Sequence, residues 1–209
     1  MSITQAEHNV SNNQPIPSRT RTGDALLFAR NFFRHPRMLG SIVPSSRFLI
    51  KQLLQPIDWN QARVIVEYGP GVGVITAEIL RRMRSDAVLI AIEMNPDFVT
   101  HLRSALPDER LQVVEASAES VVEILARFGG GKANYIISGI PFSTIPADIR
   151  ERILRNTSQA LAPGGTFLVF QFSTRVLEDL QRVFRYVRRK FEPLNVLPAH
   201  LFFCQLGAA

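Results

Sequence analysis

Three glycines at alternate positions, Gly69, Gly71 and Gly73, directly follow residues 63–68, a stretch rich in valine and isoleucine. The β-branched residues of that stretch suit a parallel strand that is covered on both faces. Glycines after such a strand let the backbone turn tightly and come close to a ligand. A turn of this kind between a strand and a helix makes a nucleotide site. The sequence therefore predicts nucleotide binding at this turn.

The spacing of the glycines argues against a dinucleotide. The dinucleotide fingerprint, Gly-x-Gly-x-x-Gly, has a third small residue for close helix packing and a helix N-terminus aimed at a pyrophosphate. Counting from Gly69 places Val74 at the third position, and counting from Gly71 places Thr76 there. The fingerprint therefore fails in both registers.

Two carboxylates accompany the glycines. Glu67 precedes the first of them by two positions, and Glu93 ends a second apolar run, residues 88–93, twenty residues after Gly73. A carboxylate at the end of the second strand can accept hydrogen bonds from both hydroxyls of a ribose. The alternative interpretation is that the glycines only shape a tight turn and that Glu93 caps the next helix.

The pattern Glu67-x-Gly69-x-Gly71-x-Gly73 resembles motif I of class I S-adenosylmethionine (SAM)-dependent methyltransferases. The resemblance implies SAM as the cofactor and S-adenosylhomocysteine as its product. Many of these enzymes have Gly-Asp-Ala after the third strand, whereas this chain has Ala116-Ser117-Ala118, which offers the adenine a hydroxyl but no carboxylate. The implied cofactor-binding residues are Glu67, Gly69, Gly71, Gly73, Glu93, Met94, Ser117, Ala118 and Ser138.

A proline-containing loop follows the fourth predicted strand, and ligands of open α/β sheets bind outside such strand ends. The loop resembles the Asn-Leu/Ile-Pro-Tyr/Phe loop of ribosomal RNA adenine dimethylases, but Gly139 stands where those enzymes have asparagine. Phe142 can stack on a base or line an apolar slot for a lipid. The alternative is a loop that only ends the strand. The predicted substrate residues are Gly139, Ile140, Pro141, Phe142 and Ser143.

The order of the elements after residue 60 predicts an α/β fold. Strands at 63–69, 88–93, 111–116, 134–139 and 166–172 alternate with helices, and residues 162–165 break the chain before the last of them. Strict alternation indicates a parallel, doubly wound sheet. Two further strands between residues 187 and 206, paired in antiparallel fashion, complete a Rossmann-like, seven-stranded class I methyltransferase sheet with an N-terminal helical extension.

We expect three segments: a disordered tail at 1–22, amphipathic or lid helices at 23–56, and the SAM-dependent methyltransferase domain at 57–209. Residues 24–35 have the period of an amphipathic helix with an aromatic face flanked by arginines, as an interfacial helix has. A lid helix packed on the sheet needs the same apolar face. The predicted membrane-contacting residues are Phe28, Arg30, Phe32, Phe33 and Arg34.

The segment Gly40-Ser-Ile-Val-Pro-Ser-Ser46, with Ser45 or Ser46 capping a helix that runs to about Leu54, resembles a segment of bacterial phospholipid N-methyltransferases. That resemblance, which extends from about Leu26 to Leu206, implies successive methylation of phosphatidylethanolamine. Enzymes that act on ornithine lipids look similar, so the lipid headgroup stays open. An RNA adenine N6-methyltransferase is the leading alternative, and a non-catalytic SAM-binding module is a third.

Candidate catalytic residues are few, because SAM is already a strong methyl donor and the enzyme must mainly orient a neutral amine. Tyr68 and Ser143 are candidates for orienting that amine, and His35 is a candidate proton acceptor. His8, His101 and His200 have no partner pattern and are expected at the surface. No clustered His, Cys or carboxylate spacing predicts a metal.

Composition sets the outer limits. The 209 residues fit one α/β domain with an appendage, and 46% hydrophobic residues indicate a packed core. A net charge of +6 favours anionic partners, either an acidic membrane surface or RNA, and no obligate protein partner is predicted. With no apolar run of spanning length and one cysteine, Cys204, we expect a cytoplasmic protein that associates peripherally with the inner leaflet.

Overall fold

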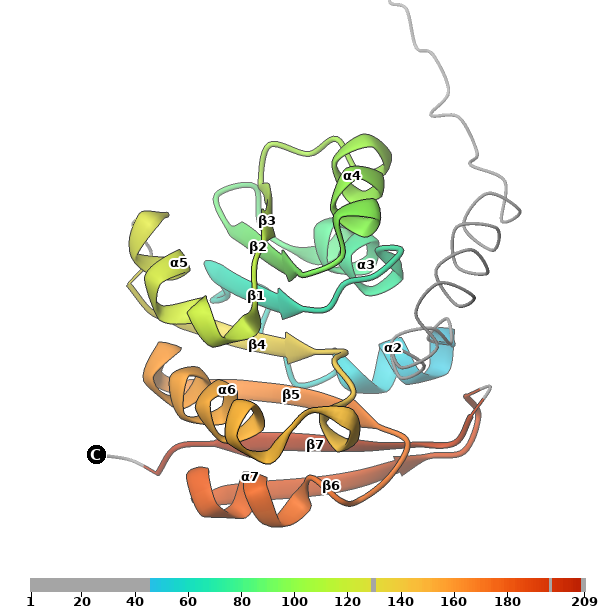
Figure 1. Cartoon of the computed structure of the whole chain (residues 1–209). Coiled ribbons are helices and arrows are strands. Elements are labelled where there is room, and N and C mark those ends of the chain that lie inside the picture. The colour runs from blue at the N-terminus through green and yellow to red at the C-terminus, as the bar shows by residue number, and fades with distance from the viewer. Residues whose placement is uncertain (1–45, 129–130, 196, 208–209) are drawn as a thin grey trace, which may run out of the picture.

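The computed structural model describes residues 46–128, 131–195 and 197–207 (Figure 1). It contains a seven-stranded sheet in the order β3-β2-β1-β4-β5-β7-β6. The strands are β1 (Val64–Tyr68), β2 (Val88–Glu93), β3 (Leu111–Glu115), β4 (Ala133–Ser138), β5 (Leu161–Gln171), β6 (Tyr186–Glu192) and β7 (Ala199–Gln205). The tail predicted at 1–22, the helix predicted at 24–35 with its membrane-contacting residues, and His35 lie outside the described residues.

The sheet confirms the predicted fold class. β1 to β5 pair in parallel, whereas β7 is antiparallel to both β5 and β6. β1, β2 and β4 are valine- and isoleucine-rich because helices cover both of their faces. The helices are α2 (Arg47–Leu53), α3 (Val74–Arg82), α4 (Pro96–Ala105), α5 (Val121–Arg127), α6 (Ala147–Ala160) and α7 (Leu177–Val183), with 3₁₀ turns η2 (Ala118–Ser120) and η3 (Phe142–Thr144).

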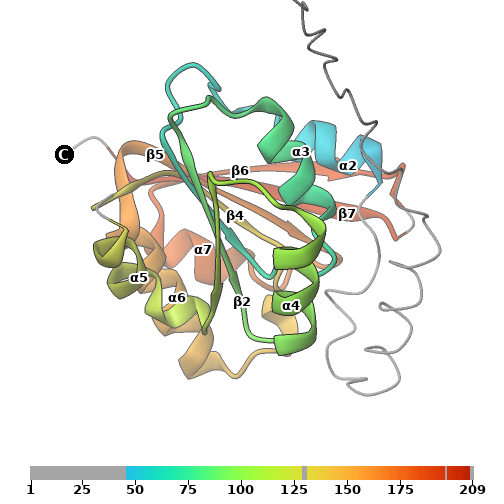
Figure 2. The same cartoon turned by 90° about the horizontal axis from the view of Figure 1, so that it is seen from above.

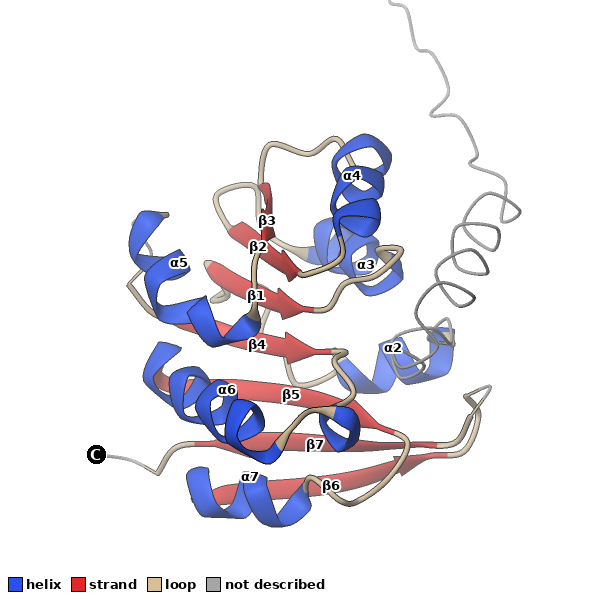
Figure 3. Ribbon diagram, in the orientation of Figure 1, coloured by secondary structure: helices blue, strands red, loops and turns tan. Residues whose placement is uncertain are grey.

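Two helical layers enclose the sheet, with α2, α3 and α4 on one face and α5, α6 and α7 on the other (Figures 2 and 3). Each layer buries its own apolar cluster against the sheet. Along β1 the side chains alternate between the clusters, so Ile65 packs on the α2 side while Val66 and Tyr68 pack on the α6 side. This alternation follows from the two-residue period of a strand.

Two details differ from the sequence-based expectation. Residues 162–165 do not break the chain; β5 starts at Leu161, and a register shift against β4 accommodates them as an irregularity in which Gly164 has a φ of 74°. The sequence analysis also missed α7, a short helix with two acids in its first turn. It is fixed by tertiary contacts, because Leu180 is fully buried in the core.

Helix α2 begins where the sequence predicts. Ser46 is its N-cap, and the Ser46 hydroxyl accepts a hydrogen bond from the Leu49 N–H at 3.2 Å. The same residue joins α2 to the β6–β7 turn, because its N–H donates to Asn195 Oδ1 at 2.8 Å and its hydroxyl donates to the Leu194 carbonyl at 3.0 Å. These contacts fix α2 beside the end of the sheet.

A buried carboxylate links β1 to α3. The Glu67 side chain is 2% exposed, and its Oε2 accepts a hydrogen bond from the Thr76 hydroxyl at 2.7 Å. Burial raises the pKa of Glu67 from 4.5 to about 7; the Thr76 hydrogen bond lowers it, and the nearby charge of Glu93 raises it further. The Glu67 carboxyl group at the end of β1 therefore gains or loses its proton near neutral pH.

Replacing Glu67 by glutamine keeps an acceptor for Thr76 but removes the titrating group. Because the pKa of Glu67 is raised from 4.5 to about 7 on folding, the folded protein retains a proton that the unfolded chain releases, and the free energy of unfolding falls as pH rises through that window. We expect the melting temperature of the wild type to fall relative to that of Glu67→Gln across this window and to run parallel above it. If the difference in melting temperature between the two proteins does not change with pH across this window, the raised pKa of Glu67 is contradicted.

Candidate active site

A pocket of about 310 Å³ opens at the edge of the sheet where the parallel strands end. The strand ends and turns contribute Gly69, Ile92, Glu93, Met94, Ala116, Ser117, Ala118, Glu119, Ile140 and Pro141, and η3 with the start of α6 contributes Thr144, Ile145, Pro146, Ile149 and Ile153. Glu93 and Glu119 are the charged residues of this lining, which is otherwise mostly apolar. The pocket thus combines an apolar wall with a small number of polar groups, as ligand sites do.

The glycine turn lies tightly against the substrate loop and α4. A Cβ atom on Gly69, which has a φ of 65°, would lie 2.7 Å from Ile140 Cγ2. A Cβ atom on Gly73, the residue before α3, would lie 2.7 Å from Leu102 Cδ2. Glycine suits both positions, because the positive φ angles, 65° at Gly69 and 83° at Gly73, strain any other residue and an added Cβ atom would displace these side chains.

Glu93 brings a carboxylate to the pocket wall at the end of β2. Its side chain is held from both sides, because Oε2 accepts a hydrogen bond from the Gly71 N–H at 3.2 Å and Oε1 accepts one from the Asn95 N–H at 2.9 Å. Burial raises the pKa of Glu93, and the backbone donors lower it in part. Each oxygen retains a lone pair that can accept a hydrogen bond from a ribose hydroxyl. Met94, the next residue, is 67% exposed and places an apolar side chain at the mouth.

The third strand ends in a polar pair. The Ser117 hydroxyl caps η2 by accepting a hydrogen bond from the Glu119 N–H at 3.2 Å. Glu119 lines the pocket and forms an ion pair with Arg152 at 2.7 Å, whereas Glu115 is exposed and lies outside the pocket lining. A carboxylate is thus present two residues after Ser117, which stands at the position of the aspartate in the Gly-Asp-Ala pattern.

Gln171, at the end of β5, fixes the substrate loop. Its Nε2 donates to the Ile140 carbonyl at 2.8 Å, and its Oε1 accepts a hydrogen bond from the Phe142 N–H at 3.1 Å. The side chain is 5% exposed, so both bonds are shielded from water. The sequence analysis missed Gln171, because no local pattern around the loop indicates a residue nearly thirty positions downstream.

Two predicted roles are corrected by burial. Phe142 is fully buried and packs edge-on against Phe167, with ring centroids 6.4 Å apart, so it does not face a base or headgroup. Tyr68 is also fully buried, and its hydroxyl shares a hydrogen bond with Thr157 Oγ1 at 3.1 Å. Burial raises the pKa of the Tyr68 phenol above its ordinary value, so the phenol stays neutral. Both aromatic residues belong to the core under α6.

The pocket brings together seven of the predicted site residues. They are Gly69, Glu93, Met94, Ser117, Ala118, Ile140 and Pro141. Outside its lining lie Glu67, Tyr68, Gly71, Gly73, Ser138, Gly139, Phe142 and the exposed Ser143. Ser138 is fully buried, and its hydroxyl has no hydrogen-bond partner among the described residues. His200, expected at the surface, is instead partly buried beside Phe191.

The residues present fit a SAM molecule. The Glu93 carboxylate suits the ribose, and the side chains of Ile92, Met94 and Ala118 suit the apolar faces of an adenine. Gly69 lines the pocket without a side chain, so a ligand can approach its backbone closely. The wall contributed by α6 and η3 was not predicted, because those residues reach the pocket through long-range packing.

Comparisons with known proteins agree with this arrangement. The family model described as methyltransferase small domain matches residues 39–193. An ornithine lipid N-methyltransferase of Singulisphaera acidiphila is 35% identical over 87% of this chain and 96% of its own length. A ribosomal RNA small subunit methyltransferase A of Acidithiobacillus ferrooxidans is 30% identical over 56% of this chain and 38% of its own.

Solved structures share the fold at low identity. A precorrin-6y C5,15-methyltransferase from Geobacter metallireducens has a TM-score of 0.58 and 15% identity, covering 76% of this chain and 88% of its own. Human methyltransferase-like protein 13 in complex with S-adenosylhomocysteine has a TM-score of 0.54 and 17% identity, covering 83% and 82%. With a family model that spans most of its length, the chain belongs to the methyltransferase small domain family and is a class I SAM-dependent methyltransferase.

Proposed function

We propose that the protein transfers methyl groups from SAM to the amino group of a membrane lipid. The observation that carries this proposal is the extent of the similarity to the ornithine lipid N-methyltransferase, which includes nearly the whole of both chains. The similarity to the ribosomal RNA enzyme covers little more than half of this chain and well under half of the relative. A lipid enzyme therefore accounts for more of the sequence.

The pocket supports amine methylation. SAM supplies an activated methyl group when bound, so the protein must hold a neutral nitrogen in line with it and exclude water. A lipid ammonium has no lone pair and must first lose its proton. The apolar side chains of Ile140, Pro141 and Ile145 favour the neutral amine, because desolvation lowers the pKa of an ammonium group.

The headgroup is part of the proposal. The resemblance to bacterial phospholipid N-methyltransferases implies phosphatidylethanolamine, whereas the relative is named for ornithine lipid. Both headgroups carry a primary amine on a short flexible arm, so the same pocket chemistry serves either. We propose a primary amino lipid as the substrate class, with these two lipids as the first to be compared and the number of methyl groups added as the readout.

RNA is the second candidate substrate, because several ribosomal RNA methyltransferases match part of the chain and the Ile-Pro-Phe loop resembles that of ribosomal RNA adenine dimethylases. Two features of the loop oppose it. A Cβ atom on Gly139 would lie 3.1 Å from the Gly69 carbonyl and 3.3 Å from Phe170 Cε1, so the asparagine of the dimethylases does not fit without movement. Phe142 is buried and is not presented to a base.

We further propose that the enzyme works at the anionic inner leaflet from the cytoplasmic side. The net charge of +6 supports attraction to acidic lipids. In the part of the chain that the structure describes, none of the helices combines the length and apolar character needed to cross a bilayer. Substrate would then reach the pocket from a membrane surface.

Replacing Glu93 by glutamine tests the ribose contact. The amide keeps the size of the side chain but turns one acceptor into a donor that faces N–H groups and ribose hydroxyls. Loss of a hydrogen bond to a charged group weakens binding by roughly 10- to 100-fold. We expect calorimetric titration with S-adenosylhomocysteine to show that loss, while Glu123→Gln on the exposed face of α5 binds as the wild type does. Equal affinity of the two variants would contradict the assignment.

Gln171→Leu tests the loop clamp, since leucine fills similar volume without either hydrogen bond to the loop. We expect kcat/KM for the lipid to fall roughly tenfold, the effect of misplacing a substrate-positioning loop, with SAM affinity retained. Gln205→Leu is the matched control: Gln205 bonds Thr166 at the far end of the same strand pair. Equal losses in both variants would point to general weakening of the sheet.

A transfer assay with labelled SAM tests the substrate class. Anionic vesicles containing phosphatidylethanolamine, the same vesicles containing ornithine lipid, and unmodified ribosomal RNA are offered separately, and the lipid products are resolved by thin-layer chromatography. We expect label in the lipid fraction and the rate to rise with pH, because a larger share of the amine is then neutral. Label confined to RNA would overturn the proposal.

A further inference from the structure

The turn between β6 and β7 exposes apolar side chains to solvent. Phe191 is 52% exposed, Leu194 62% and Leu197 47%, and two prolines, Pro193 and Pro198, lie among them. We call residues 191–195 and 197–198 the hairpin tip. Side chains of this kind are normally buried, and several together on a projecting turn mark an interaction surface.

Hydrogen bonds within the hairpin tip and to the start of α2 hold the described part of the turn. Glu192 is buried and its Oε1 accepts a hydrogen bond from the Leu194 N–H at 2.8 Å. The Asn195 amide donates to the Leu197 carbonyl at 2.9 Å and accepts from the Ser46 N–H at 2.8 Å. Since Glu192 and Asn195 are buried, the exposed side chains among the described residues of the tip are all apolar.

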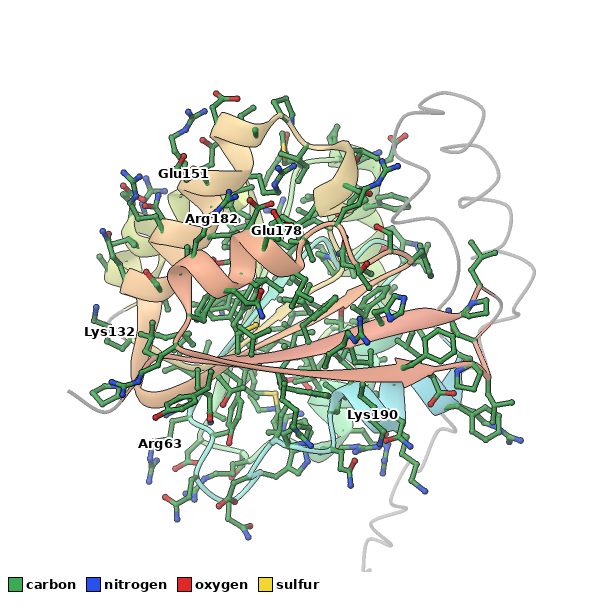
Figure 4. All side chains as sticks on the ribbon, turned by 90° about the horizontal axis from the view of Figure 1, so that it is seen from below. Arg63, Lys132, Glu151, Glu178, Arg182 and Lys190 are labelled. Atoms are coloured by element: carbon green, nitrogen blue, oxygen red, sulfur yellow. The ribbon has the colours of Figure 1, made fainter. Side chains whose placement is uncertain are left out.

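Cations flank the tip. Residues 47–54 and 186–198 contain Arg47, Lys51, Arg188, Arg189 and Lys190, and the acid among them is the buried Glu192. Lys190 lies beside α2 (Figure 4), and its ammonium group contacts the Gln52 side chain. On the exposed face of α2, Phe48 is 41% exposed with the Arg47 guanidinium 5.1 Å from its ring centroid. An apolar tip bordered by cations complements an anionic membrane surface.

The tip and the pocket share one edge of the sheet. β6 and β5 are both antiparallel to β7, so they run in the same direction, and β6 ends at the edge where the parallel strands end. The β6–β7 turn lies at that edge beside α2 in Figure 1. A membrane that contacts the tip therefore also faces the side of the molecule on which the pocket opens.

We propose that the hairpin tip is a membrane-docking surface, in which Leu194 and Leu197 enter the interfacial region of an anionic bilayer while Arg47, Lys51 and Arg189 contact the headgroups. This inference rests on the proposed function, because docking to a membrane serves an enzyme whose substrate is a lipid. It assigns the docking to a folded part of the enzyme. The tip would present the pocket to lipid headgroups at a fixed orientation.

The test compares two double variants of the full chain in co-sedimentation with vesicles of phosphatidylglycerol and phosphatidylcholine. Leu194→Ser with Leu197→Ser removes the apolar tip but leaves its hydrogen bonds, which use backbone atoms of these two residues. Phe128→Ser with Tyr186→Ser is the control, because it removes two exposed aromatic side chains away from the tip, Tyr186 being at the other end of β6.

We expect the tip variant to bind these vesicles roughly tenfold more weakly than the wild type, because less apolar area enters the interface, and the control to bind as the wild type does. Equal binding by all three proteins would overturn the proposal, as would equal losses in both variants. A fall in melting temperature of the tip variant with unchanged vesicle binding would also overturn it.

A tryptophan probe gives a second readout that does not depend on loss of binding. Trp59 is the one native tryptophan, and it lies before β1, at the opposite edge of the sheet. We expect emission from Leu197→Trp to shift to shorter wavelength on adding anionic vesicles, and emission from Tyr186→Trp to stay unchanged. An unshifted spectrum at position 197, with the protein bound to vesicles, would contradict docking through the tip.

Methyl transfer to amino lipid in detergent micelles separates the two proposals. The tip variant is expected to retain wild-type turnover there, because micelles deliver the lipid without a bilayer. Turnover in micelles together with unchanged vesicle binding by the tip variant would reject the docking surface alone. Absence of lipid turnover in every protein would reject the lipid substrate, whatever the vesicle assay shows.

Discussion

Two carboxylates buried at the ends of adjacent parallel strands organise the end of the sheet at which the pocket opens. Glu67 on β1 is satisfied by the Thr76 hydroxyl, and Glu93 on β2 by the N–H groups of Gly71 and Asn95. Burying a carboxylate is costly unless donors surround it. Here the donors belong to α3, the glycine turn and the start of α4, so the bonds that satisfy the acids also hold these elements together. The pocket is the space that this arrangement leaves open.

The regular part of this structure could be predicted because local patterns determine it. Alternation of apolar runs with helical periods fixes the parallel sheet, and the glycine spacing with Glu93 locates the ligand turn. Side-chain direction in loops could not be predicted, since it depends on distant contacts. Phe142 turns into the core because Phe167 receives it, and Gln171 reaches back to the loop from β5. A two-residue period assigns Tyr68 to a face but does not say that α6 covers it.

The chemistry asked of this pocket is modest and matches its composition. An apolar lining stabilises a neutral amine over an ammonium, while Glu93 offers fixed acceptors for the cofactor. A membrane lipid brings its own anchoring, so the pocket needs to hold only the headgroup. The proposed docking through the hairpin tip, at the same edge of the sheet, would place that side of the molecule against the membrane.

The central claim is that the enzyme methylates an amino lipid, and mass spectrometry of membrane lipids tests it most directly. The wild type and Glu93→Gln are expressed in a host whose membranes contain both phosphatidylethanolamine and ornithine lipid. The account predicts methylated forms of one of these lipids with the wild type and their absence, or near absence, with the variant. Unchanged lipids in cells expressing the wild type, with new methyl groups on ribosomal RNA, would contradict it.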